Sequence, residues 1–214
     1  MTLLAHSRLV VAGKIGGTQT WSTGIGLNGT DESAPAAATL QRFVDEFAPL
    51  VSTWFGAAVG SLNNSDVSLE KLILTSYLAG ETKAHAVAEH QFAPVVTGGS
   101  TVQSLPVFTA LVVTLLTGIP GRSGRGRMYL PMTTAPLANH QADQNMCTTV
   151  ATRTATMLIA MATAETTGQP QLIPAVCGKT GNFNITSVKV DSNPDVQHRR
   201  EDKIGALFST SAAV

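Results

Sequence analysis

The side chains best suited to bind a ligand are arginines, and they are concentrated in two short segments. Three of them alternate with glycine and serine in one turn-like segment, and two more are adjacent near the C-terminal end. A guanidinium group donates paired hydrogen bonds to phosphate oxygens, and a glycine-rich segment lets neighbouring arginines follow a nucleic-acid backbone. We therefore predict contacts with nucleic acid or with a neighbouring subunit at Arg122, Arg125, Arg127, Arg199 and Arg200. Ion pairs within the sheet remain the structural alternative, because a chain with a net charge of zero makes a poor free-standing nucleic-acid binder.

Two glycine-rich segments match nucleotide-binding motifs by letter but not by context. Residues 24–29 read G-x-G-x-x-G, but residues 30–35 separate them from the next expected helix, which should follow such a loop directly. Residues 178–180 read Gly-Lys-Thr, but Ile173 occupies the position of the first P-loop glycine. We expect no nucleotide cofactor at either segment.

Catalytic and metal-binding patterns are weak. Cys147 and Cys177 are isolated, and His85 and His90 are five residues apart, which suits a shared metal poorly on either a helix or a strand. No G-x-S-x-G elbow occurs in the sequence. We expect no catalytic residue, no metal and no other cofactor, and a hydrolase with a spatially assembled Ser or Cys147 site remains an alternative.

Hydrophobic periodicity predicts the elements that would position these residues. Strands are expected at 3–11, 19–27, 69–78, 107–116, 127–131 and 182–190, and helices at 37–59 and 139–165. Pro49 predicts a kink or a break in the first helix. Residues 81–92 are compatible with either a strand or a short helix.

This order predicts an α+β fold in which two long helices pack on one face of a mainly antiparallel sheet. A jelly-roll β-sandwich is the alternative, although the second helix is long for one. We expect a single domain over residues 1–214, and no internal repeat of fixed period is visible.

The composition favours self-association. Charged residues make up 13% of the chain and the net charge is zero, whereas charged residues provide roughly 25% of a typical globular domain. Charge depletion is typical of interface centres, and a net charge near zero promotes association. No signal peptide and no membrane span are predicted, because no apolar run is long enough.

Three spaced motifs resemble coat-like structural proteins of small viruses, mainly RNA viruses known from environmental and invertebrate sequencing. They are Trp21-Ser22-Thr23-Gly24, residues 121–131, and residues 188–191 leading to 195–200. The resemblance implies an icosahedral shell subunit with no catalytic residues. A long basic N-terminal arm of the kind that many such proteins use is lacking, which leaves the two arginine segments as candidate genome contacts.

The sequence therefore predicts a viral capsid protein that assembles from many copies and contacts genomic nucleic acid through its backbone phosphates. We expect it in the virion, assembled in the host cytoplasm, with no membrane partner and no small-molecule substrate. A phage tail or head-completion ring protein is the nearest alternative.

Overall fold

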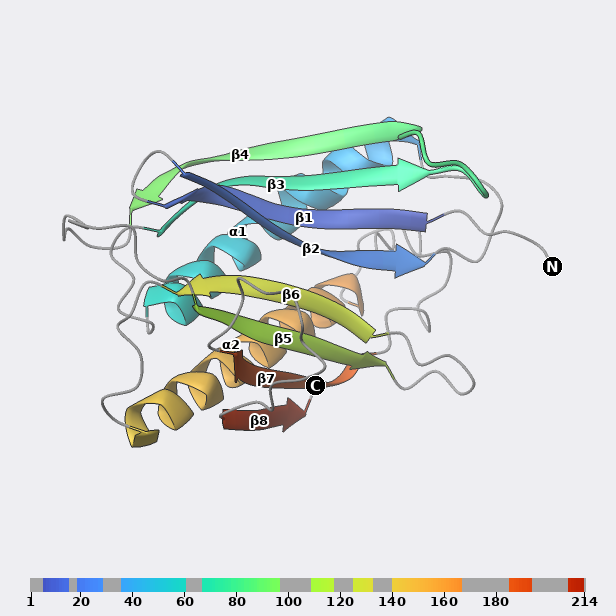
Figure 1. The fold of residues 1–214 in the computed structure, drawn as a ribbon. Coiled ribbons are helices and arrows are strands. Elements are labelled where there is room, and N and C mark those ends of the chain that lie inside the picture. The colour runs from blue at the N-terminus through green and yellow to red at the C-terminus, as the bar shows by residue number, and fades with distance from the viewer. Residues whose placement is uncertain are drawn as a thin grey trace.

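A computed structural model describes residues 6–15, 19–28, 36–60, 67–96, 109–117, 125–132, 140–166, 185–193 and 208–213 of the chain (Figure 1). In chain order the elements are β1 (His6–Ile15), β2 (Gln19–Asn28), α1 (Ala37–Gly60), β3 (Val67–Tyr77), β4 (Ala86–Val96), β5 (Thr109–Thr117), β6 (Arg125–Met132), α2 (His140–Thr166), β7 (Ile185–Asn193) and β8 (Phe208–Ala213). All strand pairs among them are antiparallel. The predicted α+β class is confirmed.

The described elements form two units of the same design, each with two strands, a helix and two further strands. The strand orders are β2-β1-β3-β4 and β6-β5-β7-β8, so corresponding strands occupy corresponding places. The sequence shows no fixed period because residues 61–66 separate α1 from β3, whereas residues 167–184 separate α2 from β7. The repeat is therefore one of topology, and it was missed in the sequence.

The jelly-roll alternative is wrong for the described strands. A jelly roll is built from two Greek keys, in which a fourth strand returns to lie beside the first. Here each sheet consists of four strands that are consecutive in the chain, and β1 lies between β2 and β3.

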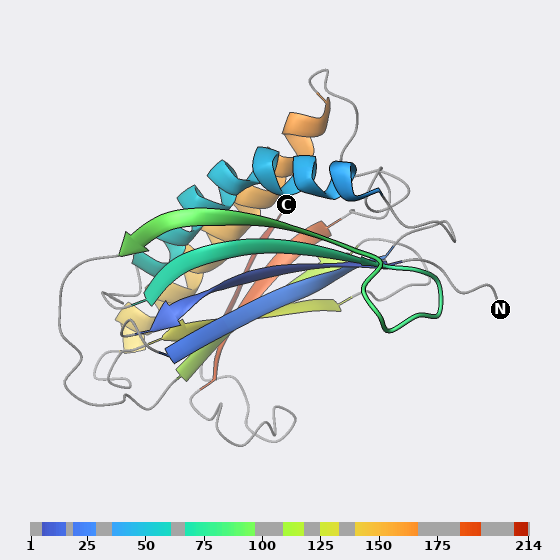
Figure 2. The ribbon, with the colours of Figure 1, turned by 90° about the horizontal axis from the view of Figure 1, so that it is seen from above.

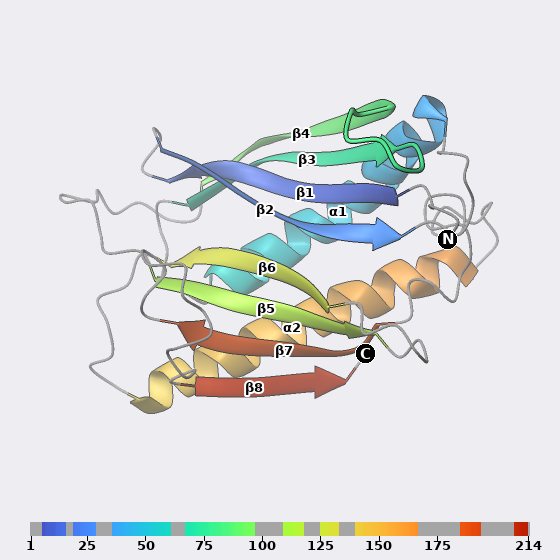
Figure 3. The same ribbon diagram turned by 45° about the vertical axis from the view of Figure 1, so that its right-hand side comes forward.

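The two sheets lie beside each other, with β2 of the first unit next to β6 of the second (Figure 3). Helix α1 packs on β3 and β4, α2 packs on β7 and β8, and the two helices also contact each other. Viewed from above, both helices are on the same side of the strands (Figure 2). One buried cluster contains residues of both units, among them Leu9, Phe55 and Leu158.

Helix α1 continues through Pro49 as one element, so of the two expectations, a kink or a break, the break does not occur. Proline lacks the N–H that would bond to the carbonyl of residue 45, and its ring disturbs the preceding turn, at a cost of about 3 kcal/mol. Pro49 is exposed, whereas Phe47, Val51 and Phe55 on the opposite face are at most 3% exposed. Burial of each such side chain contributes about 1.5–3 kcal/mol, which together exceeds the cost of the proline.

Gly13 marks an irregularity where β1 passes β3. The pairing register shifts between Ala12 and Gly13, and a Cβ at Gly13 would lie 1.7 Å from the carbonyl oxygen of Ser68. That carbonyl accepts a hydrogen bond of 3.1 Å from Trp21 Nε1 on β2. Trp21 in turn stacks on Phe55 of α1, with ring centroids 5.9 Å apart. Close approach at Gly13 thus fixes the tryptophan that joins the sheet to its helix.

Two further sequence expectations changed. The undecided segment 81–92 contributes to a strand, since β4 pairs with β3 from Ala86 onward. The strand predicted at 182–190 is β7, but it is not the last element, because β8 pairs with it on its outer side.

Candidate functional site

The predicted arginine site is only partly covered by the structure. Arg122, Arg199 and Arg200 lie outside the described residues. Arg125 and Arg127 lie on β6, where they pair with Leu116 and Thr114 of β5. They are therefore part of a regular strand and not of a turn.

The register of the second sheet relates these arginines to a lysine. Thr114 pairs with Arg127 on one side and with Lys189 of β7 on the other, so the three residues form one row across the sheet. Val188, the neighbour of Lys189 along β7, is fully buried. Because successive residues of a strand alternate between faces, the row of Arg127 and Lys189 belongs to the face opposite Val188.

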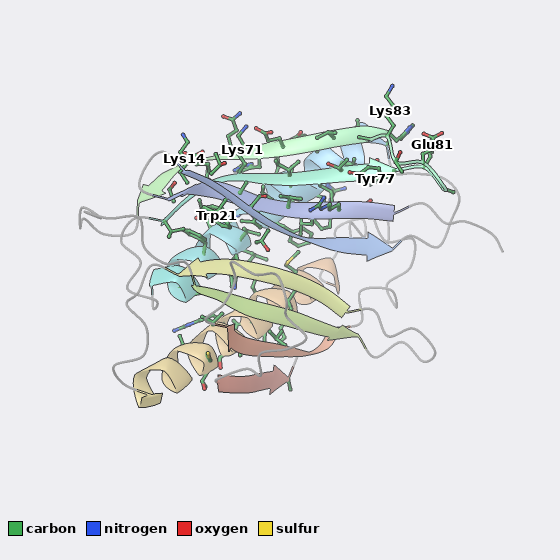
Figure 4. All side chains as sticks on the ribbon, viewed as in Figure 1. Lys14, Trp21, Lys71, Tyr77, Glu81 and Lys83 are labelled. Carbon is green, nitrogen blue, oxygen red and sulfur yellow. The ribbon has the colours of Figure 1, made fainter. Side chains whose placement is uncertain are left out.

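The first sheet has a corresponding face, which we call the open face, on the side away from α1. Residues of the covered face, such as Leu9, Leu72 and Leu74, are at most 8% exposed. On the open face Arg8 and Ser22 are exposed, and Val10 and Ile73 are half-buried. Lys14 and Lys71 lie near each other at one end of this sheet, whereas Tyr77, Glu81 and Lys83 lie at the other end (Figure 4).

Carboxylates and lysines of the open face neutralise one another. Lys14 Nζ lies 3.0 Å from Glu70 Oε1, and Lys71 Nζ lies 2.8 Å from Glu89 Oε1. Each of these four side chains is 29–41% exposed, so each pair is worth about 0–1 kcal/mol. Their main effect is to leave little net charge on this part of the face.

A polar cluster joins α1 to β4 at the outer edge of the first sheet. His90 Nδ1 lies 2.9 Å from Asp45 Oδ1. Gln41 Nε2 donates to Asp45 Oδ2 at 3.1 Å and to the backbone carbonyl of Glu89 at 3.2 Å. The helix thus reaches the backbone of the edge strand through a single amide side chain.

Both carboxylates at this edge are stabilised in their charged form. The hydrogen bond with His90, and then that from Gln41, lowers the pKa of Asp45 below its ordinary value of 3.8. The hydrogen bond from Lys71 lowers the pKa of Glu89 below its ordinary value of 4.5, with a smaller contribution from Gln91. Both groups are therefore anionic at neutral pH.

A buried hydrogen bond joins the helices of the two units. Trp54 Nε1 of α1 donates to Thr154 Oγ1 of α2 at 2.9 Å, and that hydroxyl donates to the carbonyl of Val150 at 2.8 Å. Trp54 and Thr154 are 3% and 0% exposed. A directional bond in an apolar contact fixes how one helix lies along the other.

Residues considered for catalysis or metal binding are not gathered into a site in the described part of the chain. Cys147 is fully buried on α2, and a thiol without solvent access is a poor nucleophile. His90 pairs with Asp45, and within the described segments no group of three His, Cys, Asp or Glu side chains could hold a metal ion. The helices of these segments include none that is long and apolar enough to cross a membrane.

Comparison of the chain with known protein families, with curated proteins and with solved structures gave no match. Function is therefore inferred from the geometry of the described surfaces.

Several of these contacts could not be found in the sequence. Asp45 and Glu46 are adjacent in the sequence, but Asp45 pairs with His90, whereas Glu46 lies 2.7 Å from Arg42 Nε. The only local signal for any of these contacts was the helical spacing of Arg42 and Glu46, which are four residues apart. Lys71 and Glu89 occupy polar positions of two strands, and only the strand register brings them together.

Proposed function

We propose that this chain is a viral capsid protein, many copies of which self-assemble into a closed icosahedral shell around the genome. The observation that carries the proposal is the broad, nearly neutral open face of the first sheet, with its mutually paired charges. A surface of this kind is suited to close contact, because few unpaired charges would need to be removed from water. We place the assembly of these copies into the virion in the host cytoplasm.

The exposed side of α2 supports the same proposal. Thr148, Thr152, Thr156 and Ile159 are exposed along this helix, and Arg153 is the charged residue among residues 147–161. Threonine hydroxyls are satisfied in water or at a polar interface, so such a helix face tolerates burial against a neighbour better than a charged one would.

We further propose that the genome faces the second sheet on the side opposite Val188. This side would then carry Arg125, Arg127 and Lys189, whereas Lys14 and Lys71 of the first sheet are paired with Glu70 and Glu89. These basic residues outnumber the one acidic residue of the same row positions, Asp191, although the chain is neutral overall. Such a surface suits contact with phosphates that depends on ionic strength and not on base sequence.

Size-exclusion chromatography with light scattering on the purified protein tests the proposed assembly. A closed shell predicts virus-like particles in the megadalton range, which electron microscopy would show to be icosahedral. A small ring would instead support a phage tail or head-completion protein. A monomer at all concentrations would refute the proposed function.

Replacing Arg125 and Arg127 by serine tests the proposed genome contact. The ratio of absorbance at 260 and 280 nm in purified particles should fall, because two phosphate partners per subunit are lost while the particles persist. Arg153→Ser is the control for the loss of a positive charge elsewhere, since it removes one arginine from the exposed side of α2. Loss of particles with an unchanged nucleic-acid content per subunit would identify Arg125 and Arg127 as subunit contacts instead.

A further inference from the structure

Strand β4 forms the outer edge of the first sheet. The opposite edge, β2, lies against β6 of the second unit, so one edge of this sheet already serves an association between units. We call the backbone of residues 86–91 the β4 edge. An edge strand carries a row of N–H and C=O groups that can pair with another strand.

The hydrogen bond from Gln41 shows which backbone groups point outward. Its amide reaches the carbonyl of Glu89 from α1, at 3.2 Å, and Gln41 itself is exposed. In an antiparallel pair the backbone groups of alternate residues point to the same side. The peptide groups of Val87 and Gln91, two residues to either side of Glu89, therefore also face outward.

The side chains of the β4 edge provide little of the protection that edge strands usually have. Strand β4 contains no lysine or arginine, and its one carboxylate, Glu89, is held by Lys71. Val87 is a large hydrophobic side chain and is 56% exposed. Two features that discourage strand pairing, Pro94 and the register shift between Leu69 and Lys71, affect β4 only beyond Gln91.

The neighbouring turn of α1 is charge-complementary to an inverted copy of itself. On its exposed side, Asp45 and Glu46 follow Arg42, which is half-buried and pairs with Glu46 of the same helix. A two-fold axis at the β4 edge would run the second copy of α1 in the opposite direction, so that the arginine of each copy faces the carboxylates of the other. A self-complementary patch of this kind is what an isologous contact requires.

We propose that the β4 edge pairs, in antiparallel orientation, with the β4 edge of a second copy of this chain. The proposal names one subunit contact within the assembly proposed above and so rests on that function. The ladder would extend the first sheet across the two-fold axis. In the single subunit, the Gln41 amide donates to the Glu89 carbonyl, which would accept from a backbone N–H of the second strand in the pair.

Hydrogen exchange on the unmodified protein tests the contact. Amides in peptides that cover residues 86–91 should exchange at least tenfold more slowly in particles than in the same protein dissociated by dilution, because outward N–H groups gain a partner. The exposed turn at residues 80–85 should change little and serves as an internal reference. Equal exchange of residues 86–91 in both states would overturn the β4 contact while leaving the shell intact.

A charge at the edge provides the second test. Val87→Lys should raise the protein concentration needed for assembly at least tenfold, because each of the two paired strands would bring an additional positive charge into the contact. Thr53→Lys introduces the same charge at an exposed residue of α1 outside the contact, so it is the control and should assemble as the wild type does. Normal assembly of Val87→Lys would refute the contact alone, whereas a wild-type chain that never assembles would refute the proposed function and the contact together.

Discussion

The contribution of the hydrogen bond between Trp54 and Thr154 to stability can be tested by replacing the Thr154 hydroxyl with a methyl group. Thr154→Val keeps the shape of the side chain and removes the hydroxyl that accepts from Trp54 Nε1 at 2.9 Å. Threonine and valine have similar helix propensities, so α2 itself should be little affected. The indole N–H would then be buried between the helices without its partner.

The expected magnitude follows from that burial. Leaving a buried donor unpaired costs about 1–3 kcal/mol, since it was hydrogen-bonded to water in the unfolded chain. For a chain of this size the corresponding fall in Tm is roughly 2–12 °C. The double variant Trp54→Phe/Thr154→Val should lose less stability than the two single changes together, because the second change no longer leaves a partner unpaired.

Urea unfolding, followed by circular dichroism and tryptophan fluorescence, is the suitable assay. Both tryptophans, Trp21 and Trp54, are at most 8% exposed, so their emission reports on the core. The protein concentration must be kept constant, because assembly would add to the apparent stability. Thr156→Val is the matched control: its hydroxyl donates to the Thr152 carbonyl at 2.9 Å on the exposed side of the same helix. If Thr154→Val and Thr156→Val differ by less than about 0.5 kcal/mol, the buried bond does not stabilise the contact between the units.

Two further predictions use the same assay. Gly13→Ala should destabilise the fold by about 3 kcal/mol or more, because its Cβ would overlap the Ser68 carbonyl. At Gly56 no atom lies within 4 Å of a new Cβ, so Gly56→Ala should stabilise α1 by about 0.5–1 kcal/mol. Equal changes in stability for Gly13→Ala and Gly56→Ala would contradict the close approach at Gly13. Asp45→Asn should lower the urea midpoint at about pH 5, where Asp45 is charged in both the folded and the unfolded chain. The stability that this carboxylate contributes is complete above its ordinary pKa of 3.8 and is lost as the pH falls through the lower pKa of the folded state. A difference in urea midpoint between Asp45→Asn and wild type that persisted at about pH 2 would therefore speak against the pairing with His90.

Local pattern was sufficient for the elements that bury a continuous apolar stripe. Helix α1 was predicted within one residue at its C-terminal end, because Leu40, Phe43, Phe47 and Trp54 repeat at helical spacing. The sequence left a kink or a break open at Pro49, since it does not reveal how firmly the opposite face is packed, and the structure excludes the break. The first two strands were also predicted, at 3–11 and 19–27, and β1 and β2 pair along their whole length from His6 to Asn28.

Local pattern was insufficient where a strand exists only through its neighbour. Strand β8 has the sequence Phe-Ser-Thr-Ser-Ala-Ala, which lacks a marked alternation of apolar and polar residues, and its pairing with β7 defines it. The ambiguous segment that contains β4 was likewise decided by β3. Isolated strands are not stable in water, because all of their ladder hydrogen bonds must come from another segment.

The sequence by itself determined the α+β class, both helices, the scarcity of charge and the concentration of arginine near β6. Those properties depend on residue type and on spacing within one element. Only the tertiary structure decided that Arg127 shares a row with Lys189, that Asp45 meets His90, and that two ββαββ units meet through Trp54 and Thr154. These contacts join residues far apart in the chain, and they arise only when packing and strand register have fixed which surfaces face each other.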